Sequence, residues 1–156
     1  METILILHNI RSIYNVGSMF RTADAAGISK IYLSGYSPTP LDRFGRARSD
    51  MAKVALGAEK TIHWEYFKNG YAALTKARAD GCKIVAVEQD KRATSLFNFR
   101  RKKNTRLALV MGNEVRGISK TMLDKCDEII EIPMRGRKES LNVSVAAGIA
   151  MFQLTR

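Results

Sequence analysis

Two separated stretches of this chain carry polar side chains that could act on a ligand. Asn15 and Arg21 lie on the polar side of a predicted helix, and an arginine at the carboxyl edge of an α/β sheet can hold a phosphate with two hydrogen bonds. Near the C-terminus, Glu139, Ser140 and Asn142 gather at the start of another helix pattern. The alternatives are a solvated Arg21 and an Asn15 that caps its helix. A cap explains only one of the three C-terminal residues, so that cluster favours a site.

The segment 111–119, MGNEVRGIS, follows an apolar run and spaces its glycines as G-x-x-x-x-G. A phosphate-binding P-loop has lysine directly after the second glycine, whereas this chain has Ile118 there. Glu114 also places negative charge where phosphate would lie, so we exclude nucleoside triphosphate binding. No G-x-G-x-x-G is present, which excludes the dinucleotide fingerprint. The segment is then either a plain strand-to-helix turn or a glycine turn that exposes backbone groups and one carboxylate.

The charge of the chain indicates a polyanionic partner. Lys and Arg total 26 against 15 Asp and Glu, which gives a net charge of +11. The basic residues cluster in loops rather than along one amphipathic helix, which favours nucleic acid over a membrane surface. Aromatic residues among them, Phe44, Phe97 and Phe99, either stack on bases or pack in the core. The residues expected to contact nucleic acid are Arg11, Arg43, Arg46, Arg48, Arg100, Arg101, Lys102, Lys103, Arg135 and Arg137.

Length and composition predict one globular domain over residues 1–156. No apolar run approaches the roughly 18 residues that would span a bilayer, and the N-terminus reads directly as a strand rather than a leader. Cys82 and Cys126 stand alone, as reduced thiols of a cytoplasmic protein do. With only two histidines besides, we expect no metal site.

The elements that position these residues alternate between strand and helix patterns. Short, nearly continuous apolar runs predict strands over residues 3–8, 30–34, 83–87, 107–111 and 128–132. Helix patterns cover residues 16–26, 71–79 and 120–126, with Gly27 and Ser119 as a stop and a start. A helix over 50–56 and a strand over 61–64 have weaker signals. This alternation predicts an α/β fold, a mostly parallel sheet with helices on both faces.

The last helix has two distinct faces. A stripe of large apolar residues predicts a face packed in the core: Leu141, Val145, Ile149 and Phe152. A second face is small enough for another backbone to approach closely: Ser144, Ala147, Gly148 and Met151.

Three segments together resemble the SpoU/TrmH family of SPOUT RNA methyltransferases. They match that family's three motifs in order: NVGSMFRTA at 15–23, LVMGNEVRG at 109–117 and IPMRGRKESLNVSVAAG at 132–148. The resemblance implies a C-terminal trefoil knot, which periodicity would not predict because knots are rare. It also implies a homodimer whose active site is completed across the interface. The chain is similar to the compact members of the family, which have no added RNA-binding domain.

The resemblance further implies methyl transfer from S-adenosylmethionine to a ribose 2′-hydroxyl of tRNA or rRNA. The catalytic set carried over by motif is Asn15, Arg21, Glu114, Ser140 and Asn142. The residues carried over for cofactor binding are Met111, Gly112, Glu114, Ile132, Met134, Leu141 and Asn142. The carboxylate of Glu114 is expected to accept neighbouring backbone N–H groups.

Arg21 is expected to grip the target phosphate and stabilise negative charge on the ribose oxygen. It is a poor candidate for the base because a guanidinium has a pKa above about 12. Two alternatives stay open, a knotted methyltransferase that modifies a base and a catalytically silent RNA-binding module. Asn15 and Arg21 together favour the ribose, and affinity for S-adenosylmethionine would separate an enzyme from a silent binder.

Overall fold

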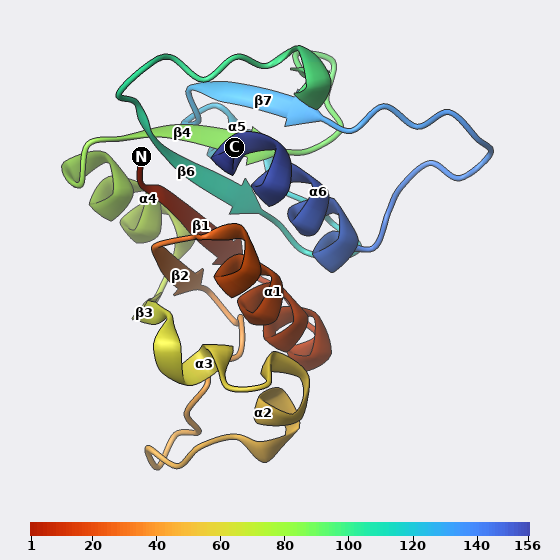
Figure 1. The fold of residues 1–156 in the computed structure, drawn as a ribbon. Helices are drawn as coiled ribbons and strands as arrows, with labels where there is room; N and C mark the ends of the chain where they lie inside the picture. Colours follow the sequence, from red (N-terminus) through yellow and green to blue (C-terminus); the bar gives the residue numbers. More distant parts are fainter.

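The computed structural model describes all 156 residues, and its chain folds into an open α/β sheet covered by helices on both faces (Figure 1). The strand order is β3-β2-β1-β6-β4-β7-β5, and every neighbouring pair is parallel, which confirms the predicted fold class. The strands are β1 Thr3–His8, β2 Lys30–Ser34, β3 His63–Phe67, β4 Cys82–Val87, β5 Thr94–Ser95, β6 Arg106–Met111 and β7 Glu128–Glu131. The helices are α1 Ile13–Ala26, α2 Ser49–Ala55, α3 Ala58–Thr61, α4 Gly70–Ala79, α5 Lys120–Leu123, α6 Val143–Thr155 and the 3₁₀ turn η1 Leu96–Asn98.

The strands are apolar throughout because both faces of the sheet are buried. In β1, Leu5 and Leu7 point into a cluster of 26 buried residues that includes residues of α1, α2 and α6. Ile4 and Ile6 point the other way, into a cluster of 15 residues that includes α4 and α5. Successive side chains along a strand therefore pack into two separate cores, one on each face of the sheet, as in other parallel sheets covered on both sides.

Local signals set most helix ends. The hydroxyl of Ser12 caps α1 by accepting from the backbone N–H of Asn15, and Gly27 ends that helix with φ of 76°. The alternative in which Asn15 caps this helix is wrong, because Ser12 is its N-cap. Ser119 caps α5 as predicted, but α5 ends at Leu123 instead of continuing to Cys126.

The central region differs modestly from the weaker predictions. The helix expected over 50–56 is α2, while the strand expected over 61–64 is β3, shifted two residues later. The short elements α3, β5 and η1 were not predicted, because runs of two to four residues are too short for a periodic pattern. The trefoil knot stays a prediction. No helix has the length and apolar character needed to cross a bilayer.

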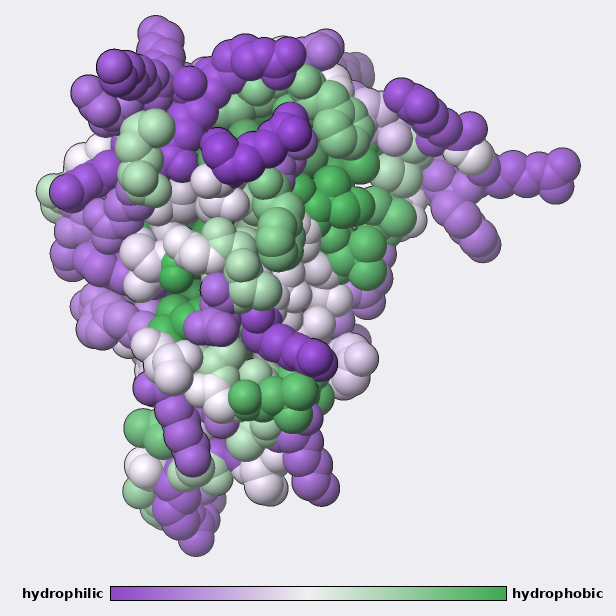
Figure 2. Space-filling view, viewed as in Figure 1, coloured by the Kyte–Doolittle hydropathy of each residue, from purple (hydrophilic) through white to green (hydrophobic).

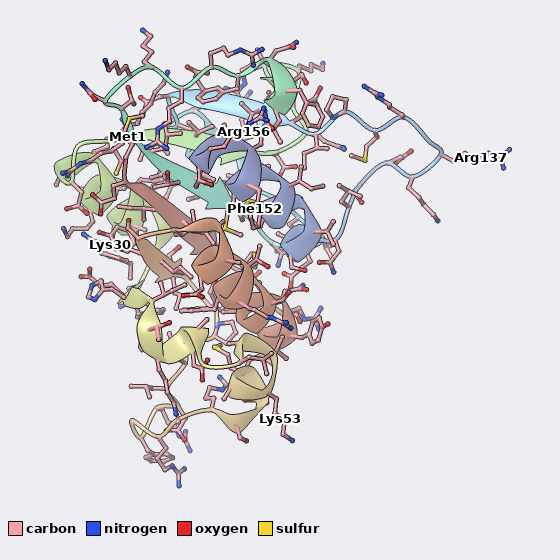
Figure 3. The ribbon with its side chains drawn as sticks, viewed as in Figure 1. Met1, Lys30, Lys53, Arg137, Phe152 and Arg156 are labelled. Carbon is pink, nitrogen blue, oxygen red and sulfur yellow. The ribbon has the colours of Figure 1, made fainter.

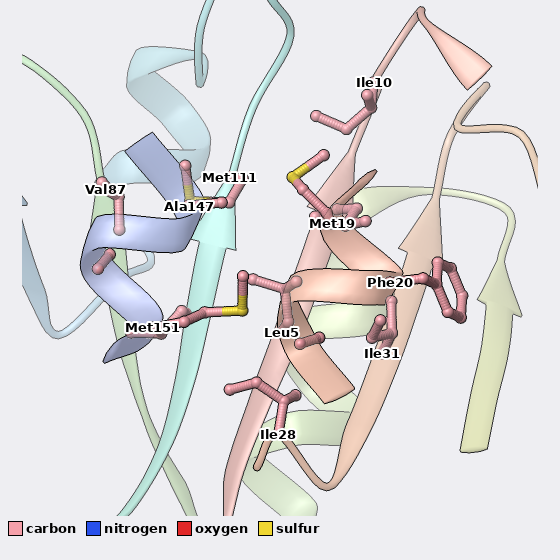
Figure 4. Close-up of a cluster of buried hydrophobic side chains, with 14 of the residues drawn as sticks. Leu5, Ile10, Met19, Phe20, Ile28, Ile31, Val87, Met111, Ala147 and Met151 are labelled. Carbon is pink, nitrogen blue, oxygen red and sulfur yellow. The ribbon is translucent and has the colours of Figure 1, made fainter. Parts of the chain in front are cut away.

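The orientation of α6 is the main correction to the sequence analysis. Most of the predicted core stripe faces outward, with Leu141 just before α6 and Val145 and Phe152 on it exposed by 40%, 49% and 52%. Only Ile149 of this stripe packs partly against the core. The buried face holds Ala147 and Met151, which Figure 4 shows pointing into the cluster beside β6.

Small residues explain this choice of face. A methyl group built at Gly148 would already lie 3.4 Å from the Thr22 side chain on α1, so the two helices lie close together. The small-residue face therefore does admit another backbone, and that backbone belongs to the same chain. The large residues of the stripe would not fit between α6 and the sheet at this separation.

The packing of α6 can be tested by enlarging one buried alanine. Ala150 is fully buried, so Ala150→Leu should lower the free energy of unfolding by about 1–3 kcal/mol through overpacking. The matched control is Ala25→Leu at an exposed position of α1, which should change it by less than about 0.5 kcal/mol. Urea denaturation measures both. Equal stability of the two variants would contradict the described orientation of α6.

Candidate active site at the carboxyl edge of the sheet

The candidate site lies where β1 and β6 run side by side and the chain leaves them in opposite directions. From β1 the chain continues to β2 on one side, whereas from β6 it continues to β7, beyond β4 on the other. The carboxyl ends of strands at such a switch point form the usual ligand crevice of an open α/β sheet. Two of the three sequence motifs begin here, because α1 follows β1 and the glycine turn follows β6.

Glu114 joins these two motifs through three hydrogen bonds. Its Oε1 accepts from the backbone N–H of Arg11 at 2.8 Å. Its Oε2 accepts from the backbone N–H of Ser12 at 2.8 Å and from the side-chain amide of Asn15 at 3.0 Å. The expected acceptance of backbone N–H groups is confirmed, and the buried Asn15 side chain turns toward Glu114 rather than toward solvent.

The same bonds keep Glu114 ionised. Burial by itself would raise the pKa of this carboxyl group, but the two backbone N–H groups and the Asn15 amide outweigh burial and lower it below the ordinary value. Glu114 is therefore a fixed negative charge at the edge of the sheet. It is no proton donor at neutral pH.

Beside Glu114 lies a cavity of about 310 Å³, within the usual size range of ligand sites. Its walls come from the ends of β4, β6 and β7 and from the segment that leads into α6. Apolar side chains from all these segments line it, namely Val87, Met111, Val115, Ile132, Met134, Leu141, Val143 and Ala146. Four carboxylates also line it, those of Glu88, Glu114, Glu131 and Glu139.

Two glycines make room for this cavity. A methyl group on Gly112 would lie 2.6 Å from the Ile118 side chain and 2.7 Å from the carbonyl carbon of Gly117, so the turn closes only with glycine there. At Gly117, φ is 65° and a methyl group would lie 2.2 Å from Oε2 of Glu88. That carboxylate instead accepts from the backbone N–H of Ile118 at 2.9 Å.

The loop that runs from β7 into α6 forms another wall of the cavity. The side-chain amide of Gln89 donates to the backbone carbonyl of Glu139, which ties this loop to the end of β4. Asn142 caps α6 by accepting from the backbone N–H of Ser144 at 2.9 Å. Figures 1 and 3 show the loop projecting from the sheet, with Arg137 at its tip.

The structure brings most of the expected residues together. Met111, Gly112, Glu114, Ile132, Met134 and Leu141 line the cavity, as does Ser140, while Asn142 does not. Arg21 lies six residues after Asn15 on α1, and its exposed side chain makes no salt bridge or hydrogen bond within the chain. It does not line the cavity of its own chain.

Sequence reasoning missed the contribution of β4. Glu88 and Gln89 directly follow this strand and line the cavity together with Asn113. The sequence did contain a signal for Glu88 and Gln89, because polar residues that directly follow a buried strand of a parallel sheet lie at its ligand-binding edge. These two residues belong to none of the three motifs and were therefore not predicted. No group of three or more His, Cys, Asp or Glu residues with a metal-binding arrangement occurs in the structure.

Most basic residues expected to contact RNA have exposed side chains, whereas the guanidinium of Arg101 is engaged within the fold. Its guanidinium donates to the carbonyls of Thr105, Leu154 and Glu2 and to the hydroxyl of Thr3. Burial also lowers the pKa of Arg101. The residue therefore ties three parts of the fold together, and charge clustering alone could not distinguish it from its neighbours.

The chain was then compared with known proteins. Residues 2–152 match the SpoU rRNA Methylase family. The chain is 34% identical over 153 residues to the 23S rRNA (guanosine-2′-O-)-methyltransferase RlmB of Escherichia coli K12, covering 98% of this chain and 59% of that protein. It thus spans less than two thirds of the length of this curated relative.

Two solved structures share the fold. The AdoMet-bound rRNA methyltransferase from Sinorhizobium meliloti superposes with a TM-score of 0.86 and 29% identity over 97% of this chain and 55% of the other. The TrmH/SpoU tRNA modifying enzyme of A. aeolicus gives a TM-score of 0.82 and 27% identity over 99% of this chain and 74% of the other. Since the match to the SpoU rRNA Methylase family extends over residues 2–152, the chain belongs to this family.

Proposed function

We propose that this chain transfers a methyl group from S-adenosylmethionine to a ribose 2′-hydroxyl of RNA. The observation that carries the proposal is the junction of motif one with motif two, made by Glu114 with Asn15 and the N–H groups before α1. This junction borders the cavity that motifs two and three line together. The relatives named above, which act on rRNA or modify tRNA, support the same reaction class.

The cavity fits S-adenosylmethionine in shape and in charge. Its apolar walls suit an adenine ring, and Gly112 and Gly117 let backbone groups come close to a ligand. None of the four cavity carboxylates has a basic partner, so their charge is free to attract a cationic sulfonium or ammonium group. When bound, the cofactor supplies an already activated methyl group.

The residues of the chain then have to align the reactants. Holding donor and acceptor in line can contribute about 7–11 kcal/mol to lowering the barrier. Arg21 grips the phosphate of the target nucleotide and stabilises negative charge on the attacking ribose oxygen. Asn15 and Glu114 fix the start of α1, which carries Arg21, while Ser140 and Asn142 hold the third motif at the cavity mouth.

A second copy of the chain completes the site. The stripe exposes Val145 and Phe152 on the outer side of α6 and Leu141 just before that helix, whereas Ile149 is partly buried against the core. Figure 2 looks onto this face, where apolar surface gathers near the helix. Figure 3 shows Phe152 on the same outer side of α6. A self-complementary pairing of this stripe across a two-fold axis would bury it. Arg21 lies beside this face of α6, because the next residue on α1, Thr22, packs against Gly148 of α6.

The RNA partner is ribosomal or transfer RNA, and the cytoplasm is the expected location. Exposed basic loops provide the docking surface through Arg11, Arg43, Arg46, Arg48, Arg100, Lys102, Lys103, Arg135 and Arg137. Assaying methyl transfer to total tRNA and to rRNA from cells that lack the protein would identify the class and separate ribose from base products.

The glycine turn is tested by Gly112→Ala. The added methyl group would collide with the backbone of Gly117 at the cavity, at a cost of about 1–3 kcal/mol, or roughly 5- to 150-fold in affinity for S-adenosylmethionine. Gly136→Ala is the matched control, because a methyl group there meets nothing within 4 Å. Calorimetric titration measures both affinities. If both variants bind the cofactor as the natural chain does, the cavity is not its site.

The role of Arg21 is tested by Arg21→Ala, which should abolish methyl transfer and leave cofactor affinity near normal. Arg21→Lys should recover only part of the activity, because a lysine cannot make the two-point contact with phosphate. Lys60→Ala, at an exposed position of α3, is the control for loss of one positive charge. Activity of Arg21→Ala within a fewfold of the natural chain would contradict this role.

Mixing Arg21→Ala with Gly112→Ala, at a cofactor concentration too low to fill the Gly112→Ala cavity, shows which subunit Arg21 serves. A heterodimer of Arg21→Ala with Gly112→Ala holds one intact cavity and one intact arginine on opposite subunits. Methyl transfer should therefore reappear on mixing if Arg21 acts on the partner's cavity. A mixture that stays inactive, although sedimentation detects heterodimers, would place Arg21 at its own cavity.

The interface is tested by Phe152→Asp, which puts a charge into the apolar stripe. Its dimer should dissociate at least about tenfold more readily, since burying an unpaired charge in an interface is unfavourable. Phe44→Asp is the matched control at an exposed phenylalanine outside the stripe. Analytical ultracentrifugation measures the association. A Phe152→Asp chain that associates as well as Phe44→Asp would exclude α6 from the interface.

A further inference from the structure

A second hollow lies outside the cavity, between the end of β2 and the edge strand β3. It is an open groove of about 1220 Å³. Three aromatic side chains line it, Tyr36, Trp64 and Tyr66, together with Arg43 and Arg48. We call these five residues the aromatic groove. None of them belongs to the three motifs, and the proposed chemistry uses none of the aromatic side chains.

Two rings of the groove are exposed although hydrogen bonds hold them in place. Tyr36 is 58% exposed, yet its hydroxyl accepts from the Asn113 amide at 3.0 Å and its backbone N–H donates to Oδ1 of Asn9 at 3.2 Å. The exposed Tyr66 donates its hydroxyl to the carbonyl of Gly35 at 2.8 Å. Rings fixed in this way can stack on a base with little loss of side-chain freedom.

The groove adjoins the cavity through one side chain. Asn113 lines the cavity, and the same Nδ2 that bonds Tyr36 also donates to the carbonyl of Asn9 at 3.0 Å. The Tyr36 ring thus stands between the cavity and the rest of the groove. A nucleic acid strand whose ribose reaches the cavity would pass over this ring with its next nucleotides.

The loop between β2 and α2, with the first turn of α2, brings two arginines, Arg43 and Arg48, and two aspartates, Asp42 and Asp50, to the wall of the groove. Asp42 shapes this loop by accepting from the backbone N–H groups of Phe44 at 2.8 Å and Arg46 at 3.0 Å. The guanidinium groups of Arg43 and Arg46 lie 4.8 and 5.0 Å from the centre of the Phe44 ring. This loop forms the lower projection in Figures 1 and 3, with nitrogen-bearing side chains at its tip.

The charges around the groove leave one arginine unpaired. Asp42 is engaged by Arg46, and Asp50 lies 3.6 Å from Arg48. Arg43 takes part in no salt bridge, so its guanidinium is available to a phosphate. Aromatic faces beside a free arginine match the two parts of a nucleotide, its base and its phosphate.

We propose that the aromatic groove binds an unpaired nucleotide adjacent to the methylated one, with its base stacked on Tyr36 and its phosphate at Arg43. The proposal rests on the proposed function for its RNA partner. It requires a single-stranded target, because paired and stacked bases offer no free face to a side chain. The groove would thereby select loops or unpaired segments of RNA.

Trp64 is the only tryptophan of the chain, so its fluorescence reports directly on the groove. The full chain is titrated with a short oligoadenylate, an abasic oligomer of the same length, and an RNA duplex. Oligoadenylate should change the Trp64 signal and bind more tightly than the other two. Tyr36→Ala should weaken oligoadenylate binding roughly 5- to 150-fold, and Arg43→Ser should weaken both single-stranded oligomers.

Two variants separate stacking from a structural role of Tyr36. Tyr36→Phe keeps the ring and loses the bond to Asn113, so its affinity should stay within about twofold of the natural chain. Tyr71→Ala removes an exposed tyrosine from α4 and should have no effect. A Tyr36→Phe chain as weak as Tyr36→Ala, or equal binding of the abasic oligomer, would overturn the proposal.

The remaining outcomes are also decisive. A duplex that gives the full Trp64 response, or RNA binding without any change in Trp64 fluorescence, would place the RNA elsewhere. An apolar peptide that alone produces the response would assign the groove to a protein partner. Affinity for S-adenosylmethionine is measured on the same samples. Its absence beside an intact oligoadenylate response contradicts the proposed function and leaves the groove standing.

Discussion

The hydrogen bonds of the Glu114 carboxylate are the constraint on which the site depends. Glu114 comes from the turn after β6, and its partners lie at the start of α1, about a hundred residues earlier in the chain. Strands β1 and β6, which precede these two segments, are neighbours in the sheet, but strand pairing fixes only the backbone within the strands. The Glu114 carboxylate holds the loops after the two strands in a fixed arrangement, because its two oxygens can accept all three hydrogen bonds. A neutral amide at this place would offer fewer acceptors and no charge.

The packing of α6 is the second constraint, and it divides the roles of that helix. Its small inner face, with Ala147 and Ala150, lets α6 approach α1 and the sheet closely. The helix can then begin at the cavity, where Val143 lines the wall, while Val145 and Phe152 stay outside. One helix thus closes the core, borders the ligand cavity and leaves an apolar surface exposed, which the proposed dimer would cover. Exchanging the faces would remove this exposed surface.

The sequence predicted the sheet well and the surfaces poorly. The limits of β1 and β2 agree with expectation because strands buried on both faces have an unbroken apolar pattern. Periodicity found the stripe on α6 but could not tell whether the core packs against it, since an exposed apolar face has the same pattern as a buried one. Charge counting grouped Arg101 with its neighbours because its acceptors are backbone carbonyls from distant segments. The motifs located the cavity, yet the end of β4 became visible only when the strands were placed side by side.

The distribution of charge separates the two reactants of the proposed reaction. The chain has a net charge of +11, yet the cavity is lined by four carboxylates and no basic residue. A polyanion is drawn to the basic loops and repelled from the cavity, whereas a cationic sulfonium compound is favoured inside it. In the proposed reaction RNA therefore stays at the mouth of the cavity, where only the ribose has to reach in. The proposed reaction also requires that the positive charge facing the reacting oxygen come from outside the cavity wall, and the exposed Arg21 is the residue proposed for this role.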